Sequence, residues 1–178
     1  MYNTLINAMN QKKIISIYSD DQDHFMVGYI CKIINEKLIM LNIGVYGEFD
    51  GYSVILVDSI LRVEIDSLYL KRIGLVSNAY IEDIDLDESE NAFEAMLKYA
   101  EKKAWITAVR LENAETEIRG YIKCSDKTTV TISQINDFGE YDGETIFFMK
   151  DILKIVVNDV ECALIDRIVK LKKANIGN

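Results

Sequence analysis

An acidic segment near the middle of the chain carries oxygen-bearing side chains at the spacing of a calcium-binding loop. Such a loop supplies carboxylate, hydroxyl and amide oxygens at alternate positions over about twelve residues. The matching side chains are Asp83, Asp85, Asp87, Ser89, Asn91 and Glu94. Glu88 occupies the sixth position, where a glycine normally makes the sharp turn. The sequence therefore favours an acidic linker whose Ser89 or Asn91 caps the next helix, and a calcium-responsive module is a further alternative.

The remaining reactive residue types do not form a catalytic pattern. His24 is the single histidine and lies beside the acidic turn 19–23, where a surface position is expected. The three cysteines lack paired metal-ligand spacing and are expected to be reduced, small apolar residues; they are Cys31, Cys124 and Cys162. The nine glycines are scattered and form no phosphate-binding loop. We therefore expect a protein that is not an enzyme and needs no cofactor.

One short stretch occurs twice. Gly47–Tyr52 reads GEFDGY, and Gly139–Glu144 reads GEYDGE. Asp-Gly between two apolar runs predicts the tip of a β-hairpin, because both residues tolerate a positive φ. Aromatic side chains near the two tips are binding candidates, although they could instead fold back and close a barrel mouth. These candidates are Tyr46, Phe49, Tyr52, Phe138 and Tyr141.

The similarity between the two halves extends well beyond these tips. At a shift of 92 positions, Gly28-Tyr29-Ile30 matches Gly120-Tyr121-Ile122. Further upstream, Lys12-Lys13 matches Lys102-Lys103, which predicts two more residues in the first hairpin of the second copy. We interpret the chain as a tandem duplication. The predicted domains are 1–77 and 92–178, joined by an acidic linker, 78–91.

Apolar periodicity predicts a short helix, a five-stranded meander and a second helix in each copy. The first copy should end in a helix capped by Asp66 or Ser67. The apolar face expected for that helix consists of Leu68, Tyr69, Ile73 and Val76. The second copy should begin with a helix whose buried face consists of Phe93, Met96, Leu97 and Ala100. The last helix should bury Leu164, Ile165, Ile168 and Leu171, and Trp105 should lie in the core.

The net charge of −9 is unevenly distributed. Residues 78–95 carry seven acidic side chains and no basic one, whereas residues 96–178 carry thirteen of each sign. Neither copy therefore offers the net basic field on which nucleic-acid binding usually depends. No apolar run reaches the length of a membrane span, and the N-terminus does not look like a secretion signal. We expect a soluble, cytoplasmic protein without a membrane partner.

The helix, the five strands and the bend glycines Gly28 and Gly120 resemble an Sm-like (LSm) barrel, one of the small SH3-type barrels. An Ile-x-x-Val/Ile motif in each last strand, at Ile60 and Ile152, strengthens the resemblance. For this family the resemblance implies assembly through strand edges into rings and, in many members, binding of single-stranded RNA.

The RNA-reading pattern of that family has an Asp six residues after the bend glycine and an Asn four residues further on. The first copy has Ile34 and Leu38 at these positions, and the second has Asp126 and Val130. RNA binding is therefore an alternative, carried by Lys123, Asp126 and Lys127, and it gains support if these lysines share a face with Lys150 and Lys154.

Together, these observations predict a mainly β protein with two tandem five-stranded Sm-like barrels, each flanked by short α-helices. The function expected is that of a non-enzymatic scaffold or protein-interaction module. Its partner would be another protein or a second copy of the chain, because exposed edge strands invite pairing.

Overall fold

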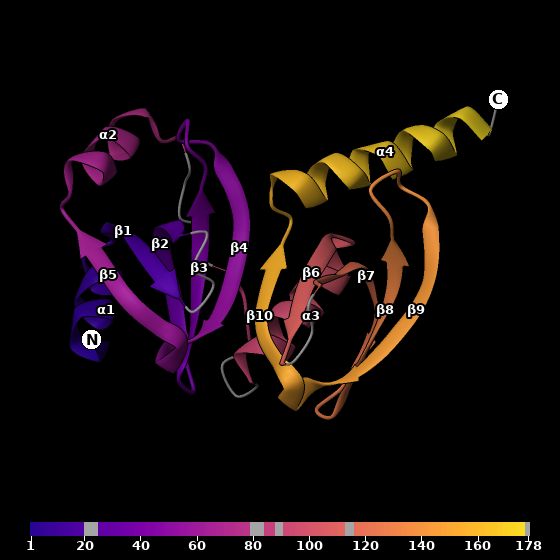
Figure 1. The fold of residues 1–178 in the computed structure, drawn as a ribbon, viewed down its shortest axis with the longest axis horizontal. Helices are drawn as coiled ribbons and strands as arrows, with labels where there is room; N and C mark the ends of the chain where they lie inside the picture. The colour runs from indigo at the N-terminus through magenta and orange to yellow at the C-terminus, as the bar shows by residue number, and fades with distance from the viewer. Residues whose placement is uncertain (20–24, 79–83, 88–90, 113–115, 177–178) are drawn as a thin grey trace. The chain divides into compact units, whose positions relative to one another are not determined.

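The protein is mainly β. A computed structural model describes residues 1–19, 25–78, 84–87, 91–112 and 116–176 (Figure 1). The described residues form ten strands and four α-helices. None of these helices has the length and apolar character needed to cross a bilayer. The chain divides into two compact units, Met1–Asp85 (unit 1) and Leu86–Asn178 (unit 2), and the boundary falls inside the expected joint 78–91.

Unit 1 contains a five-stranded antiparallel sheet with the order β5-β1-β2-β3-β4. Four consecutive strands form a meander, and the fifth returns to pair with the first. A 3-10 turn, Val57–Ser59, precedes the fifth strand. The elements are α1 (Tyr2–Asn10), β1 (Ile14–Ser19), β2 (Phe25–Ile34), β3 (Lys37–Ile43), β4 (Phe49–Leu56), β5 (Ile60–Ile65) and α2 (Leu68–Val76).

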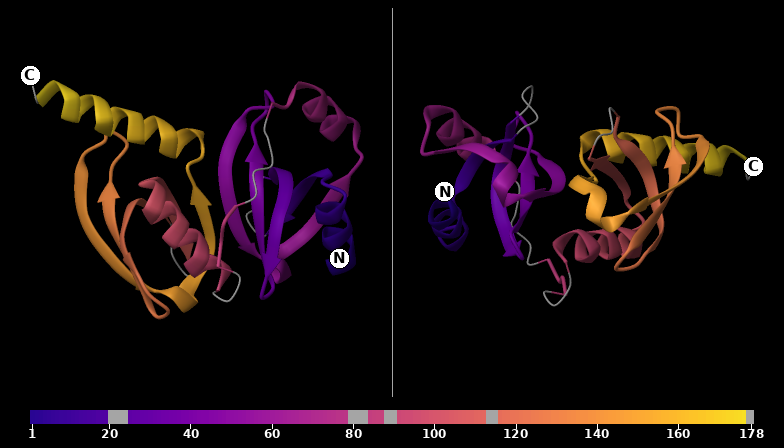
Figure 2. Two further views of the ribbon diagram at one scale, coloured as in Figure 1. Left: turned by 180° about the vertical axis from the view of Figure 1, so that it is seen from behind. Right: turned by 60° about the horizontal axis from the view of Figure 1, so that its bottom comes forward.

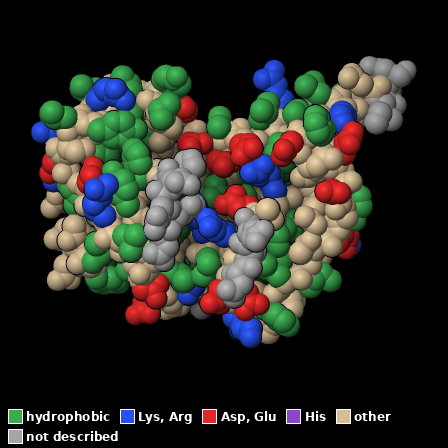
Figure 3. Space-filling model, in the orientation of Figure 1, with side chains coloured by type: hydrophobic (Ala, Val, Ile, Leu, Met, Phe, Trp, Pro, Cys, Tyr) green, Lys and Arg blue, Asp and Glu red, His purple; other side chains and the backbone are tan. Residues whose placement is uncertain are grey.

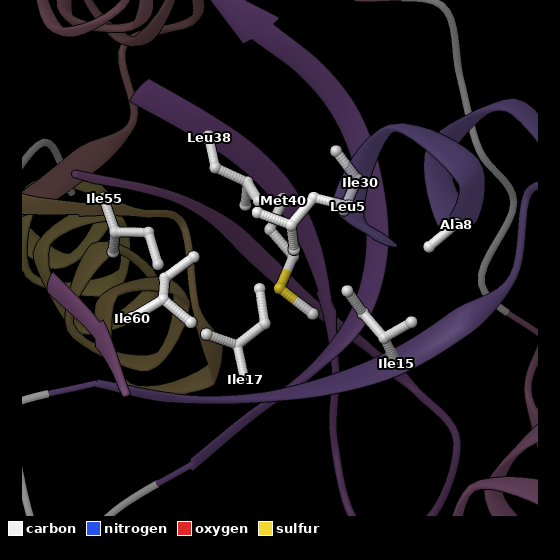
Figure 4. Close-up of a cluster of buried hydrophobic side chains, with 9 residues drawn as sticks. All are labelled: Leu5, Ala8, Ile15, Ile17, Ile30, Leu38, Met40, Ile55 and Ile60. Carbon is white, nitrogen blue, oxygen red and sulfur yellow. The ribbon is translucent and has the colours of Figure 1, made fainter. Parts of the chain in front are cut away.

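The core of unit 1 lies between α1 and the sheet. Leu5 and Ala8 are three residues apart, so they share one face of α1, and both are buried against strand side chains (Figure 4). The buried strand members of this cluster are Ile15, Ile17, Ile30, Leu38, Met40, Ile55 and Ile60. Each fully buried Leu or Ile side chain contributes roughly 1.5–3 kcal/mol relative to an exposed one. This cluster therefore holds the helix on the sheet.

Unit 2 has the same succession of elements, and its strand order is β10-β6-β7-β8-β9 (Figures 1 and 2). Its helix α4 packs on the sheet through Cys162 and Ile165, which contact Ile106 and Ala108. A 3-10 turn, Met149–Asp151, again precedes the last strand. The elements are α3 (Ala92–Lys103), β6 (Ile106–Leu111), β7 (Ile118–Ser125), β8 (Thr129–Ile135), β9 (Tyr141–Phe148), β10 (Ile152–Val157) and α4 (Val160–Ile176).

The two predicted bend glycines lie where neighbouring backbones approach closely. A Cβ atom on Gly28 would lie 1.8 Å from the carbonyl oxygen of Leu41, and one on Gly120 would lie 2.1 Å from that of Ser133. No side chain fits at such distances, so the prediction of a close approach in β2 and β7 is confirmed.

The prediction that Asp-Gly forms the hairpin tips was wrong, although both hairpins exist. The first chain reversal lies at 44–48, where the Gly44 N–H donates to the Glu48 carbonyl at 2.9 Å. Asp50-Gly51 lies inside β4 as a bulge, because two residues there face one residue of β3. Gly51 has φ 74°, which a glycine adopts without strain. Asp142-Gly143 makes the same bulge in β9.

The predicted difference between the first hairpins of the two halves was also wrong. Ile15 pairs with Gly28 in unit 1, and Thr107 pairs with Gly120 in unit 2, so the shift of 92 positions continues upstream. The residue equivalent to Lys12 is therefore Ala104. Both have a left-handed conformation at the end of their helix, with φ 49° and 51°. The repeated Lys-Lys pair is a coincidence of local composition.

Two predicted helix faces need correction. Ser67 caps α2 as expected, accepting a hydrogen bond from the Leu70 N–H at 3.3 Å. The buried face of α2 differs from the prediction, because Leu70 and Ile73 are buried whereas Leu68 and Val76 are exposed. The buried stripe of α4 consists of Cys162, Ile165 and Val169, whereas Leu164 and Leu171 are exposed. The prediction for α3 is confirmed, since Phe93, Met96, Leu97 and Ala100 are all buried.

Candidate functional site

The end strand β9 of unit 2 has a strand neighbour on one side only, among the residues that the structure describes. An end strand presents a row of backbone N–H and C=O groups that another strand can pair with. Three apolar side chains of β9 are exposed, namely Tyr141 (64%), Ile146 (69%) and Phe148 (56%). We call this strand and these side chains the β9 edge. It is the candidate functional site.

The exposure of Ile146 and Phe148 follows from the alternation of side chains along a strand. Residues 146–149 are all apolar, reading Ile-Phe-Phe-Met. Phe147 points into the core and is 8% exposed, so its neighbours must point to the opposite face of the sheet. Ile146 and Phe148 are not among the binding candidates predicted from the sequence. The apolar run 146–149 could have indicated their exposure, because consecutive apolar residues in a strand must lie on both faces of the sheet.

Polar groups accompany the β9 edge. Lys123 of β7 forms an ion pair with Glu144 of β9, and the hydrogen bond with Glu144 raises the pKa of Lys123. The Lys150 ammonium lies 5.6 Å from the centre of the Phe148 ring, within the range of a cation–π contact. Apolar and charged groups are thus mixed along the edge, as they are at many protein–protein interfaces.

The turn before β9, Asn136–Glu140, is held in place by its own side chains and by α4. The Asn136 Oδ1 atom accepts hydrogen bonds from the N–H groups of Phe138 and Glu140, both at 3.0 Å. The Glu140 carboxylate accepts a hydrogen bond from Lys172 at 2.9 Å, and this contact is the main cause of a lowered Glu140 pKa. The turn is therefore ordered by Asn136, and the start of β9 contacts α4 through an exposed ion pair.

The predicted aromatic candidates do not form one cluster. Phe138 and Tyr141 are 71% and 64% exposed at the β8–β9 hairpin, as a binding surface requires. In unit 1, Tyr46 is exposed in the turn, whereas Tyr52 is buried and contacts Phe49 edge to face at 5.3 Å. Tyr52 therefore packs as a structural residue, and the structure brings only Tyr141 into the β9 edge.

The residues predicted for RNA binding make contacts within the protein. The Asp126 carboxylate accepts hydrogen bonds from Thr128 and Thr129, which lower its pKa to about 2. Lys123 is paired with Glu144, and Lys127 is exposed. Cationic and acidic side chains are interspersed on the face drawn in Figure 3. RNA binding stays a prediction, and a filter-binding assay across salt concentrations tests it.

The acidic segment is described only in part. Asp83 and Ser89 lie outside the described residues, as does His24. Asn91 caps α3 as predicted, accepting a hydrogen bond from the Phe93 N–H at 3.0 Å. Glu94 is buried in α3 and pairs with Lys98 at 3.0 Å. Within the described ranges, no three His, Cys, Asp or Glu side chains are grouped so that they could hold a metal ion.

The three cysteines are thiols in different environments. Cys31 is half-buried, Cys124 is exposed and Cys162 is buried under α4. Burial raises the pKa of Cys162, so this thiol is not activated as a nucleophile.

Comparison with known proteins gives no family for this chain. No family model matches it, and neither a search of curated proteins nor a search of solved structures found a match.

Proposed function

We propose that this protein is a non-enzymatic scaffold that assembles with copies of itself through the β9 edge of one copy and β5 of the next. The observation that carries this proposal is the exposure of three apolar side chains on an end strand. Apolar groups beside unpaired backbone donors and acceptors are stabilised when another strand covers them.

The partner strand in this assembly is β5, the end strand of unit 1. Its Leu61 side chain is 61% exposed. Its Arg62 guanidinium lies 3.7 Å from the centre of the Tyr18 ring, which holds this cation in place. β5 carries Arg62 and Glu64, which pair with each other at 3.6 Å, and β9 carries Asp142 and Glu144, so the contact between the two strands rests on backbone pairing and apolar side chains rather than on opposite net charge. Because the two surfaces differ, the contact is head-to-tail and generates either a closed ring or a chain.

We also propose that each unit is a small Sm-like barrel. The fifth strand pairs with the first in both units, and the backbone of the second strand approaches that of the third at Gly28 and Gly120. Both features curve a short five-stranded sheet around its own core. A measured structure in which the two sheets are flat and do not curve around separate cores would contradict this.

Light scattering coupled to size-exclusion chromatography tests the assembly. Wild-type protein should have a mass above that of one chain, and Ile146→Lys should lower it because it places a charge in the strand interface. Leu164→Lys is the matched control, since Leu164 is also exposed in unit 2 but lies on α4. A monomeric wild type, or equal loss of mass in both variants, would contradict the proposal.

Mixing two variants tests the head-to-tail geometry. Ile146→Lys leaves β5 intact, and Leu61→Lys leaves the β9 edge intact, so a mixture of the two should form heterodimers that grow no further. Leu61→Lys protein that still forms dimers by itself would show that β9 pairs with β9, and the head-to-tail geometry would then be wrong.

A further inference from the structure

Unit 2 contains a pocket of about 310 Å³ between the end of α3, strand β7 and helix α4. Its apolar wall consists of Ala100, Ala104, Trp105, Ile122 and Val169. Small-molecule sites have volumes of roughly 300–1,000 Å³ and are mostly apolar with a few polar groups. The pocket is at the lower end of that range and therefore suits a small ligand.

The end of α3 holds the aromatic part of this wall in a defined position. The Trp105 N–H donates to the Ala100 carbonyl, and the Ala104 N–H donates to the Glu101 carbonyl, both at 3.0 Å. These two bonds, with Ala104 in the left-handed conformation, form a Schellman motif. Trp105 was expected in the core but is half-buried, with its ring edge to face with Tyr99 at 5.8 Å.

Three polar groups of the pocket satisfy one another. The Tyr121 hydroxyl donates to Asp166 at 2.6 Å, and Lys170 pairs with the same carboxylate. The Asp166 side chain is only 14% exposed. Burial, helped by this hydrogen bond, raises the pKa of Tyr121, so its hydroxyl stays protonated and donating. This group closes one side of the pocket and leaves no net charge there for a ligand to neutralise.

Two charges of the lining remain. Glu101 comes from α3 and Lys173 from α4, and neither forms an ion pair within the part of the chain that the structure describes. The Glu101 carboxylate and the Lys173 ammonium are therefore not within ion-pair distance of each other. Both line the same pocket as the apolar wall. A ligand that complements this lining has one positive group, one negative group and an apolar body.

We propose that this pocket binds a free α-amino acid with an apolar side chain. The ligand ammonium pairs with Glu101, its carboxylate pairs with Lys173, and its side chain packs against Trp105 and Ala100. An amino acid carries both charges on one carbon and an apolar group beside them, so it matches all three parts of the lining. This inference is independent of self-association through the β9 edge.

Trp105 is the only tryptophan of the chain, so its fluorescence reports directly on the pocket. The probe is L-phenylalanine, titrated into the full chain. Two matched probes each lack one charged group: phenylacetate has no ammonium, and phenethylamine has no carboxylate. L-Phenylalanine should bind about two- to fivefold more tightly than either, since a partly exposed ion pair contributes up to about 1 kcal/mol and a factor of ten corresponds to about 1.4 kcal/mol.

Variants assign the two charges. Glu101→Gln should remove the preference for L-phenylalanine over phenylacetate, and Lys173→Gln should remove its preference over phenethylamine. Lys127→Gln, an exposed lysine outside the pocket, should change neither preference. Ala104→Leu should weaken all three probes by filling the pocket from its exposed side, with the fold checked by circular dichroism.

The inference is overturned if no probe changes the Trp105 emission at millimolar concentration. It is also overturned if all three probes bind equally well, or if Glu101→Gln and Lys173→Gln leave both preferences intact.

Discussion

Replacing Ala104 by glycine should stabilise unit 2. Ala104 ends α3 with φ 51° and ψ 45°, in the left-handed region. That conformation costs a residue with a Cβ atom roughly 1–2 kcal/mol, and glycine avoids this cost. Glycine loses more backbone entropy on folding, which offsets roughly 0.5–1 kcal/mol of the gain. The net expectation for Ala104→Gly is an increase in the free energy of unfolding of about 0.5–1 kcal/mol.

Urea unfolding followed by circular dichroism measures this change. Ala163→Gly is the matched control, because Ala163 is exposed within the regular helix α4. The same substitution there should destabilise by up to about 1 kcal/mol. If Ala104→Gly lowers the stability as much as Ala163→Gly does, then Ala104 is not strained and the description of the α3 terminus is wrong.

Three further predictions concern unit 2. Gly120→Ala should destabilise by about 3 kcal/mol or more in urea unfolding, because the added Cβ would lie 2.1 Å from a backbone carbonyl; unchanged stability would refute the close approach. Ile165→Ala should cost about 2–5 kcal/mol in the same assay, whereas Leu164→Ala should stay within about 0.5 kcal/mol, and similar losses would refute the assigned helix face. The Glu140 carboxyl should titrate by NMR below its ordinary range and return towards it in Lys172→Gln; its contact therefore stabilises the fold above the ordinary Glu pKa and is lost as pH falls through the lowered value.

Helix α3 shows what periodicity predicts well. Its large apolar residues repeat every three or four positions and are buried as predicted, although the first turns of the helix are buried on all sides and include Glu94. Helix α4 has apolar residues on more than one side, so its pattern was compatible with several faces. Contact with β6 and β7 selects the stripe through Ile165 and Val169, and such tertiary contacts are not visible in a single helix.

The Asp-Gly pairs failed as tip markers for a local reason. A tight turn and a β-bulge both need a residue with positive φ. The Asp-Gly dipeptide therefore indicates a residue with positive φ but does not distinguish a hairpin turn from a bulge. The match between Lys12-Lys13 and Lys102-Lys103 was misleading because it was based on residue type, whereas the structurally equivalent positions share a backbone conformation. Ala104 and Lys12 share a left-handed position without sharing a residue type.

The candidate site was only partly predictable. Tyr141 was named from its place beside Asp-Gly, whereas the exposure of Ile146 depends on which face of β9 the core occupies. The pocket in unit 2 was not predicted at all, because its lining comes from α3, β7 and α4, which are far apart in sequence.

The turn glycine Gly139 ties the β8–β9 hairpin to α4. A Cβ atom there would lie 2.8 Å from the Ile168 side chain, so this side chain of α4 packs directly against the backbone of the turn. Any side chain larger than that of glycine at position 139 would therefore push the turn away from Ile168, immediately before β9 begins.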